Sequence, residues 1–143
     1  WIRRQRQMCI RDRYYIPAQI SGCLLGVMFA NVFFEHSLLE LSNKNRDGLH
    51  IFVSEIVATF GLIFIIFATL KDGKTIVAIS VATYISAGYW FTSSTSFANP
   101  AVSLARTFTD SFTGINYLNT PTYILAEFIG LILAAYILRI IYK

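Results

Sequence analysis

Asn99-Pro100-Ala101 follows a long apolar stretch, at a place where a membrane-spanning chain is not expected to put polar backbone. Asparagine is among the preferred N-cap residues and proline is favoured at the first helical position, so the tripeptide predicts the start of a helix. The sequence from there to Arg106 is long enough for roughly two or three turns. Non-helical backbone at membrane depth is tolerated only where it is buried in protein or lines a water-filled cavity. The motif therefore predicts a short re-entrant helix beside a pore.

The composition supports a membrane protein, because 55% of the residues are apolar. A helix needs about 20 residues to cross the hydrocarbon core of a bilayer. Four segments approach or reach that length, at residues 15–34, 51–70, 75–91 and 123–142. The segment 51–70 offers no polar face to water, which argues against a soluble helical core. We expect an all-α integral membrane protein with four spanning helices and one re-entrant half-helix within residues 92–120.

The net charge of +4 comes from the N-terminal segment, which holds five of the twelve lysines and arginines before Tyr14. The remaining charges balance. The string Met8 to Tyr14 resembles translated sequencing-adapter sequence, so we expect residues 1–14 to be a non-native or disordered leader. A basic terminus can bind nucleic acid or anionic lipid. Because no soluble domain is present to support nucleic-acid binding, we expect membrane lipid as the partner and no nucleic acid.

The distribution of lysine and arginine predicts an orientation in the membrane. One set of positive charges lies in the turn 71–74 and near the C-terminus, and a smaller set lies in the loop 37–50. The two sets are Lys71, Lys74, Arg139 and Lys143, against Lys44 and Arg46. We therefore expect the turn and the C-terminus on the cytoplasmic side, with Asn-Pro-Ala entering from the outer face.

The residue pattern contains no catalytic or metal-binding arrangement. Cys9 and Cys23 suggest no disulfide or metal site, and His36 and His50 have no ligand-spaced partner, so we expect both histidines in a solvated loop. No nucleophile and base are suitably spaced. We expect neither an enzyme nor a cofactor.

An internal repeat links residues 16–22 with residues 124–130, in which isoleucine, alanine and glycine recur in register. Three predicted membrane crossings separate the copies, so the copies run in opposite directions, as in inverted-topology repeats. Gly22 and Gly130 also have a simpler interpretation as small residues at close helix contacts.

Residues 94–102, together with the Ala18-Gln19-x-x-Gly22 span and Glu55-x-x-x-Thr59, resemble the aquaporin, or major intrinsic protein, family over residues 15–143. Within it they are most similar to bacterial aquaglyceroporin-like members associated with arsenic compounds. The resemblance implies six spanning helices and two half-helices that each begin with Asn-Pro-Ala. The chain then corresponds to the last four spans and the second half-helix, a partial inverted-repeat bundle. It further implies a homotetramer in the bacterial inner membrane.

The chemistry of Asn99 follows from its position. Its side-chain oxygen can accept a free N–H of the first helical turn, which turns the NH₂ group toward the lumen as a donor. A helix N-terminus carries about half a positive charge. Such an end repels cations and protons while an uncharged solute oxygen accepts from the amide.

The resemblance also implies the positions of the selectivity filter. In the family an arginine usually follows Asn-Pro-Ala, but here Val102 occupies that position, and the other readable positions are Ser96 and Ala87, with Gly88 beside it. All three filter side chains are small and uncharged. We predict a wide filter without a fixed positive charge that admits water, glycerol-like polyols or metalloid hydroxides.

Several residues are expected to support the re-entrant segment. The resemblance implies that Glu55, with Thr59 on the same helix, braces the loop through backbone N–H groups. Glu127 takes the place of Gln19 in the repeat, so we expect the two residues to share a packing or hydrogen-bonding role.

Arg106 has two possible roles. Asp110 lies at i+4 and favours a local ion pair, with backbone carbonyls as other partners. Alternatively, because Arg106 shares a helix face with Val102, it returns a positive charge to the pore mouth.

Three classes of function remain open: a passive channel, an ion-coupled secondary transporter with a broken helix, and a non-conducting membrane fragment. A channel is the function that the pattern favours.

Overall fold

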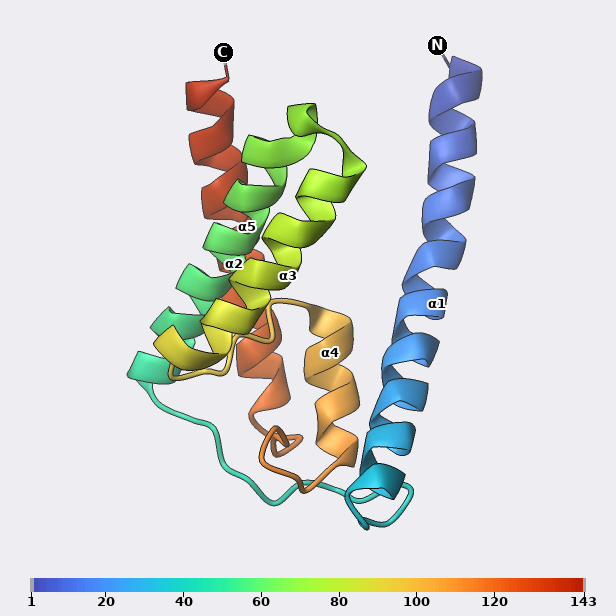
Figure 1. The fold of residues 1–143 in the computed structure, drawn as a ribbon, viewed down its shortest axis with the longest axis vertical. Coiled ribbons are helices and arrows are strands. Elements are labelled where there is room, and N and C mark those ends of the chain that lie inside the picture. The colour runs from blue at the N-terminus through green and yellow to red at the C-terminus, as the bar shows by residue number, and fades with distance from the viewer. Residues whose placement is uncertain (1, 143) are drawn as a thin grey trace.

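The computed structural model describes residues 2–142, with side chains from Arg13 onward, and consists there of helices joined by loops (Figure 1). Short 3-10 turns, η1 (Leu70–Asp72) and η2 (Arg106–Phe108), extend the second and fourth α-helices. The α-helices are α1 (Ile2–Phe33), α2 (Leu49–Thr69), α3 (Lys74–Phe91), α4 (Pro100–Ala105) and α5 (Thr120–Ile141). No strand occurs in the described residues, so the predicted all-α class is confirmed.

Three helical segments are long and apolar enough to cross a membrane, over Arg13–Phe33, Leu49–Asp72 and Thr120–Ile141. They match three of the four predicted spans. Large apolar side chains remain exposed along them, which water would disfavour and lipid tails accommodate. The chain is therefore a multi-pass membrane protein.

The fourth predicted span is α3, which forms a helix over Lys74–Phe91. It contains a lysine at its start and several serines, threonines and tyrosines. Eighteen residues extend over about 27 Å, slightly less than the roughly 30 Å of hydrocarbon. In Figure 1 it runs beside α2, but its crossing of the membrane stays a prediction.

Helix α1 begins at Ile2, well before the predicted start of the first span at residue 15. The backbone of residues 2–14 thus continues a helix. Trp1 and the side chains before Arg13, including that of Cys9, lie outside the described part of the chain. The origin of residues 1–14 as a non-native leader stays a prediction.

The two copies of the internal repeat run in opposite directions, as predicted. In Figure 1, α1 descends from the N-terminus while α5 rises toward the C-terminus, and the α2–α3 turn lies at the same end as the C-terminus. The predicted common side for that turn and the C-terminus is therefore observed.

Gly130 allows α2 and α5 to pack closely. A Cβ atom at Gly130 would lie 2.6 Å from the carbonyl oxygen of Ile56 and 3.0 Å from the Cβ of Thr59. A side chain there would overlap the neighbouring backbone, so glycine is required for this approach. Gly22, its counterpart in the repeat, has nothing within 4 Å among the described residues. Close packing explains only the second of the two glycines.

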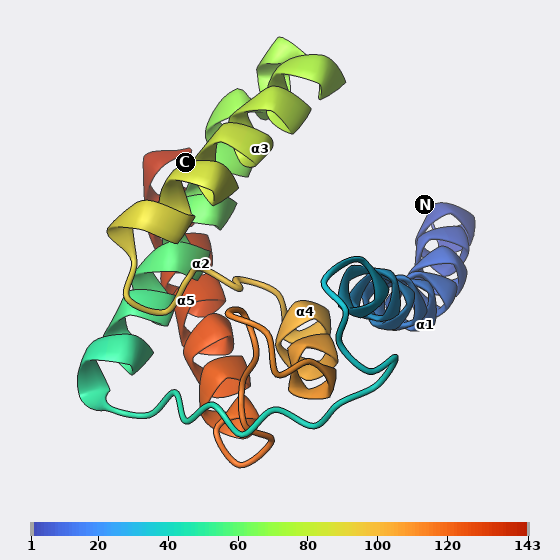
Figure 2. The same ribbon diagram turned by 60° about the horizontal axis from the view of Figure 1, so that its bottom comes forward.

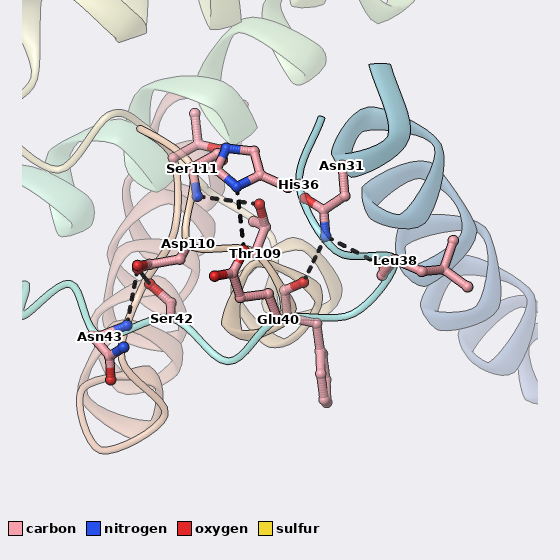
Figure 3. A network of polar contacts seen from close by, with 11 residues as sticks. Asn31, His36, Leu38, Glu40, Ser42, Asn43, Thr109, Asp110 and Ser111 are labelled. Atoms are coloured by element: carbon pink, nitrogen blue, oxygen red, sulfur yellow. Dashed lines mark hydrogen bonds and ion pairs between the residues drawn. The ribbon is translucent and has the colours of Figure 1, made fainter. Parts of the chain in front are cut away.

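The loop between α1 and α2 crosses the lower end of the bundle beneath α4 and α5 (Figure 2). Its backbone pairs with the segment after α4, since Ser42 N donates to Thr107 O at 2.9 Å and Asn116 N donates to Lys44 O at 2.8 Å. The Asn31 amide joins the end of α1 to this segment through Phe108 O at 3.0 Å (Figure 3). The loop therefore anchors the segment that carries α4.

The histidines differ from their predicted environment in one case. His36 lies in the loop and contacts Glu40 at 3.2 Å, as Figure 3 shows. His50 lies in the first turn of α2, which begins at Leu49, so its assignment to a loop is wrong. The helix begins at Leu49, two residues before the start of the predicted span at residue 51.

Candidate functional site

Helix α4 begins in the interior of the bundle. After α3 ends, the chain turns back to mid-height, and α4 then descends beside α1 (Figure 1). Asn99 is its N-cap in an extended conformation, and its Oδ1 accepts from Ala101 N at 2.9 Å, with Pro100 at the first helical position. The predicted half-helix and its cap are therefore present. Local cap chemistry is sufficient to explain where this helix begins.

The loop ahead of α4 is strained. Thr95, Ser96 and Ala98 have φ values of 64°, 48° and 49°, in the left-handed region. That conformation costs roughly 1–2 kcal/mol for each residue with a side chain. Such strain persists only where surrounding contacts hold it, and it concentrates at functional sites.

Two buried carboxylates hold this loop. Glu55 on α2 is 0% exposed and accepts from Ala98 N at 2.5 Å and from Phe97 N at 3.4 Å. Glu127 on α5 is 2% exposed and accepts from Asn99 N at 3.1 Å and from Ser103 Oγ at 2.6 Å. These hydrogen bonds offset part of the cost of burying the two acids, while Glu127 Oε2 is buried without a partner in the described residues. Together they offset the strain by satisfying four donors.

Glu127 makes the hydrogen bonds that were expected for it. Gln19, its counterpart in the repeat, makes no such hydrogen bonds in the described part of the chain. Gln19 is exposed on α1 and makes no hydrogen bond within the described residues. Thr59 is buried on α2, and its hydroxyl has no acceptor in that part of the chain. Thr59 instead contributes its Cβ to the close contact at Gly130.

The Asn99 side chain has a free donor. Its Oδ1 is occupied by the helix cap, and its Nδ2 donates to no acceptor in the described part of the chain. Asn99 borders a cavity of about 360 Å³ between the start of α4, α1 and α5. The cavity is mostly apolar and includes Gln19 in its wall. An amide donor is thus available at the edge of a cavity large enough for a small molecule.

The three expected filter residues have different environments. Ala87 is exposed, Val102 is partly buried and Ser96 is 3% exposed. Ser96 packs against Gly88, where an added Cβ would lie 2.7 Å from its Oγ. The residue of α3 that meets Ser96 is therefore Gly88, while its neighbour Ala87 is exposed.

Arg106 does not pair with Asp110. The Asp110 carboxylate accepts from Asn43 N at 3.0 Å and from Ser42 Oγ at 3.3 Å, in the network of Figure 3. The expected ion pair is wrong because the loop from α1 supplies these donors to Asp110. Ser42 and Asn43 are far from Asp110 in the chain, so the spacing of nearby residues could not predict these contacts.

The guanidinium of Arg106 instead lies among aromatic rings. It is 4.3 Å from the centre of the Phe97 ring and 5.6 Å from that of Tyr89, and its Nη2 donates to the Tyr89 hydroxyl. The ring of Phe97 also packs against Tyr123, at 5.0 Å between centroids. Sequence analysis did not identify this cluster, because its members are far apart along the chain.

Arg46 reaches the same cluster from the loop before α2. Its guanidinium donates to Phe112 O at 2.7 Å, to Gly114 O at 2.8 Å and to Thr95 Oγ1 at 3.3 Å. It lies 5.6 Å from the centre of the Phe97 ring. Arg46 therefore joins the outer loop to the strained segment ahead of α4.

The polar groups of this region are few and are held in place by the surrounding helices. Within the described residues, no group of three or more histidine, cysteine, aspartate or glutamate side chains could hold a metal ion. What the site offers is one free amide, one guanidinium and hydroxyl groups on a rigid support. Each of these groups can hydrogen-bond to an oxygen atom.

No family model and no solved structure matches the chain. The chain is 42% identical over 125 residues to the aquaglyceroporin AqpS of Rhizobium meliloti (strain 1021). The alignment covers 87% of the chain and 54% of that protein. The chain therefore spans about half the length of this curated relative.

Proposed function

Because the chain belongs to the aquaporin, or major intrinsic protein, family, we propose that it forms part of a passive channel for water and small uncharged solutes. One observation carries the proposal: the free Nδ2 of Asn99 borders a cavity at the start of a half-helix inside the bundle. A relative that is a channel protein indicates a channel rather than an enzyme.

The Asn99 amide acts as a fixed donor. Its oxygen is held by Ala101 N, so the NH₂ group cannot rotate freely and donates to a solute oxygen in the cavity. The aligned peptide units of α4 add partial positive charge at the same end. A neutral hydroxyl accepts from this site, whereas a cation is repelled by it.

The rigid support of the loop favours passive flow. Glu55 and Glu127 hold the backbone on both sides of Ala98 from two different helices. Transporters with broken helices rock one bundle against another around the site. A loop braced by α2 and α5 together, which pack extensively on each other, opposes such rocking.

The solute class follows from the filter positions. We assign the filter to Ala87, Ser96 and Val102, whose side chains are small and uncharged. They leave room for glycerol-like polyols or metalloid hydroxides as well as water. The similarity to an aquaglyceroporin supports this class. By the same family comparison we propose a homotetramer in a bacterial inner membrane, with no cofactor.

Stopped-flow swelling of liposomes tests this function. The liposomes contain the product of the complete reading frame that includes these 143 residues, and protein-free liposomes serve as the control. We expect glycerol entry that is linear in the gradient and unaffected by dissipating ion gradients. Saturable entry that stops when sodium and proton gradients collapse indicates a coupled transporter. The absence of water and glycerol entry indicates a non-conducting protein.

The 143-residue chain, reconstituted in parallel, tests how much of the pathway these residues build alone. Flux through the complete product but not through this chain indicates that a wall of the pore lies outside these residues. Blue native electrophoresis of the complete product tests the tetramer, and a monomer contradicts it.

A further inference from the structure

We propose that Arg106 supplies the fixed positive charge of the outer mouth of this channel and thereby decides its selectivity between uncharged solutes and cations. The inference rests on the proposed function, since it describes how the same pathway discriminates. It replaces the expectation of a filter without fixed charge, which followed from the small uncharged side chains at Ala87, Ser96 and Val102.

The position of the guanidinium is set by two aromatic rings next to the filter positions. Phe97, at 4.3 Å, directly follows Ser96 in the chain, and Tyr89 lies two residues after Ala87. Arg106 itself lies one helical turn after Val102 on the same face of α4 and η2. Two filter positions therefore lie within two residues of the aromatic residues that hold the guanidinium, and the third lies one turn before Arg106.

The aromatic contacts fix the charge rather than neutralise it. A guanidinium over an aromatic face is held by the ring quadrupole and keeps its full charge. Arg106 is also the C-cap of α4, where a cation is favoured by the backbone dipole. Both effects retain the side chain at the outer end of the half-helix.

No carboxylate forms an ion pair with Arg106 among the described residues, although Glu55, which accepts from the backbone of Phe97, is near enough for its charge to act on the guanidinium. Asp110, the nearest acid in sequence, accepts from Ser42 and Asn43, and the only contact of ion-pair geometry in that part of the chain joins His36 and Glu40. The Nη1 of Arg106 is buried and has no acceptor there. The second charge near Phe97 is that of Arg46, which is also positive.

Arg106 borders a cavity of about 220 Å³ between the outer part of α4 and α1. Hydroxyl groups of Thr109, Ser111 and Thr113 form one part of its wall, and Val102 and Val27 form an apolar part. A polyol in this cavity can bond to the hydroxyl groups and place carbon atoms toward the valines. The guanidinium acts on it through its charge, since its Nη1 is buried and its Nη2 donates to Tyr89. A metal cation or hydronium finds no anionic group there and is repelled by the arginine.

The test measures cation leak and glycerol entry in the same liposomes, made with the complete reading frame. The variants are Arg106→Met, which removes the charge at similar length, and Arg106→Lys, which keeps it. Lys44→Met is the matched control, because Lys44 is an exposed cation on the outer loop. Proton leak is followed with an enclosed pH-sensitive dye, and sodium leak with a sodium-sensitive dye.

We expect Arg106→Met to raise both leaks by about tenfold or more, a factor that corresponds to about 1.4 kcal/mol of barrier. Arg106→Lys and Lys44→Met should exclude cations as the unmodified protein does. Leaks that are unchanged in Arg106→Met overturn the inference. Equal leaks in Arg106→Met and Arg106→Lys also overturn it, because the positive charge then has no effect on cation exclusion.

Tyr89→Phe provides a second variant in case Arg106→Met does not fold. It removes the hydroxyl that accepts from Arg106 but keeps the ring, and we expect a smaller rise in cation leak. An unchanged leak in a folded Tyr89→Phe protein, together with loss of folding in Arg106→Met, assigns Arg106 a structural role and overturns the inference. If the unmodified protein passes no glycerol, the proposed function fails first and the inference fails with it.

Discussion

The carboxylate of Glu127 lies 3.1 Å from the backbone nitrogen of Asn99, so a residue of α5 holds the residue that caps the half-helix. The same carboxylate accepts from Ser103 Oγ at 2.6 Å, one turn into α4. Glu55 on α2 holds the two residues immediately before Asn99. The direction of the Asn99 amide therefore depends on how α2 and α5 pack together.

Glu127→Ala should lower the free energy of unfolding by about 2–6 kcal/mol, because two buried donors each lose an acceptor at about 1–3 kcal/mol. Glu127→Gln should lose less, since its amide oxygen can still accept from Asn99 N. Circular dichroism during SDS titration in mixed micelles measures both. A Glu127→Ala loss below about 0.5 kcal/mol, the scale of ordinary surface substitutions, contradicts the bracing role.

Asn99→Asp should separate the cap from the pore donor. Aspartate caps a helix about as well as asparagine, so the unfolding free energy should change by less than about 0.5 kcal/mol. Its carboxylate replaces the NH₂ donor with negative charge, so glycerol entry should fall and proton leak should rise. Liposome swelling and an enclosed pH dye measure the two. Unchanged glycerol entry with intact folding contradicts the position of Asn99 in the pathway.

Gly130→Ala should destabilise the 143-residue chain by about 1–3 kcal/mol through overpacking against α2. The added Cβ meets the carbonyl oxygen of Ile56 at 2.6 Å, and that backbone atom cannot easily move. Gly22→Ala is the matched control, because nothing lies within 4 Å of that position. Unfolding in mixed micelles compares them, and equal effects exclude the close contact as the cause.

Val102→Arg should narrow the filter that we assign. A second guanidinium one turn before Arg106 occupies volume that a polyol needs, while a water molecule still passes. Glycerol permeability should fall by about tenfold, equivalent to about 1.4 kcal/mol of barrier, and water permeability far less. Stopped-flow swelling under glycerol and sucrose gradients measures the ratio. Equal losses of both permeabilities would show that Val102 is not a filter residue.

Much of the fold could be predicted because its signals are local. Long apolar runs determine α1, α2 and α5 through their length and the thickness of a bilayer, and Asn99 with Pro100 determines the start of α4 through cap chemistry. These features need no knowledge of the neighbours. The opposite directions of α1 and α5 follow from the number of crossings between them.

The partners of the charged residues could not be predicted in the same way. Arg106 has Asp110 at i+4, yet it contacts Phe97 and Tyr89, because the loop from α1 reaches Asp110 first. Ser96 contacts Gly88 rather than Ala87, because it is Gly88 that faces the loop ahead of α4. Helix rotation and loop path set these contacts, and neither leaves a pattern in nearby residues.

The sequence itself thus determined which segments can span the membrane, through the length of the apolar runs, and where the half-helix begins, through Asn99 and Pro100. Both effects arise from residues that are neighbours in the chain. Only the tertiary structure decided that Glu127 serves Asn99 and that Arg106 stacks on Phe97. Hydrogen bonds and aromatic contacts act over a few ångströms. They form only after packing, as at Gly130, brings distant helices to one place.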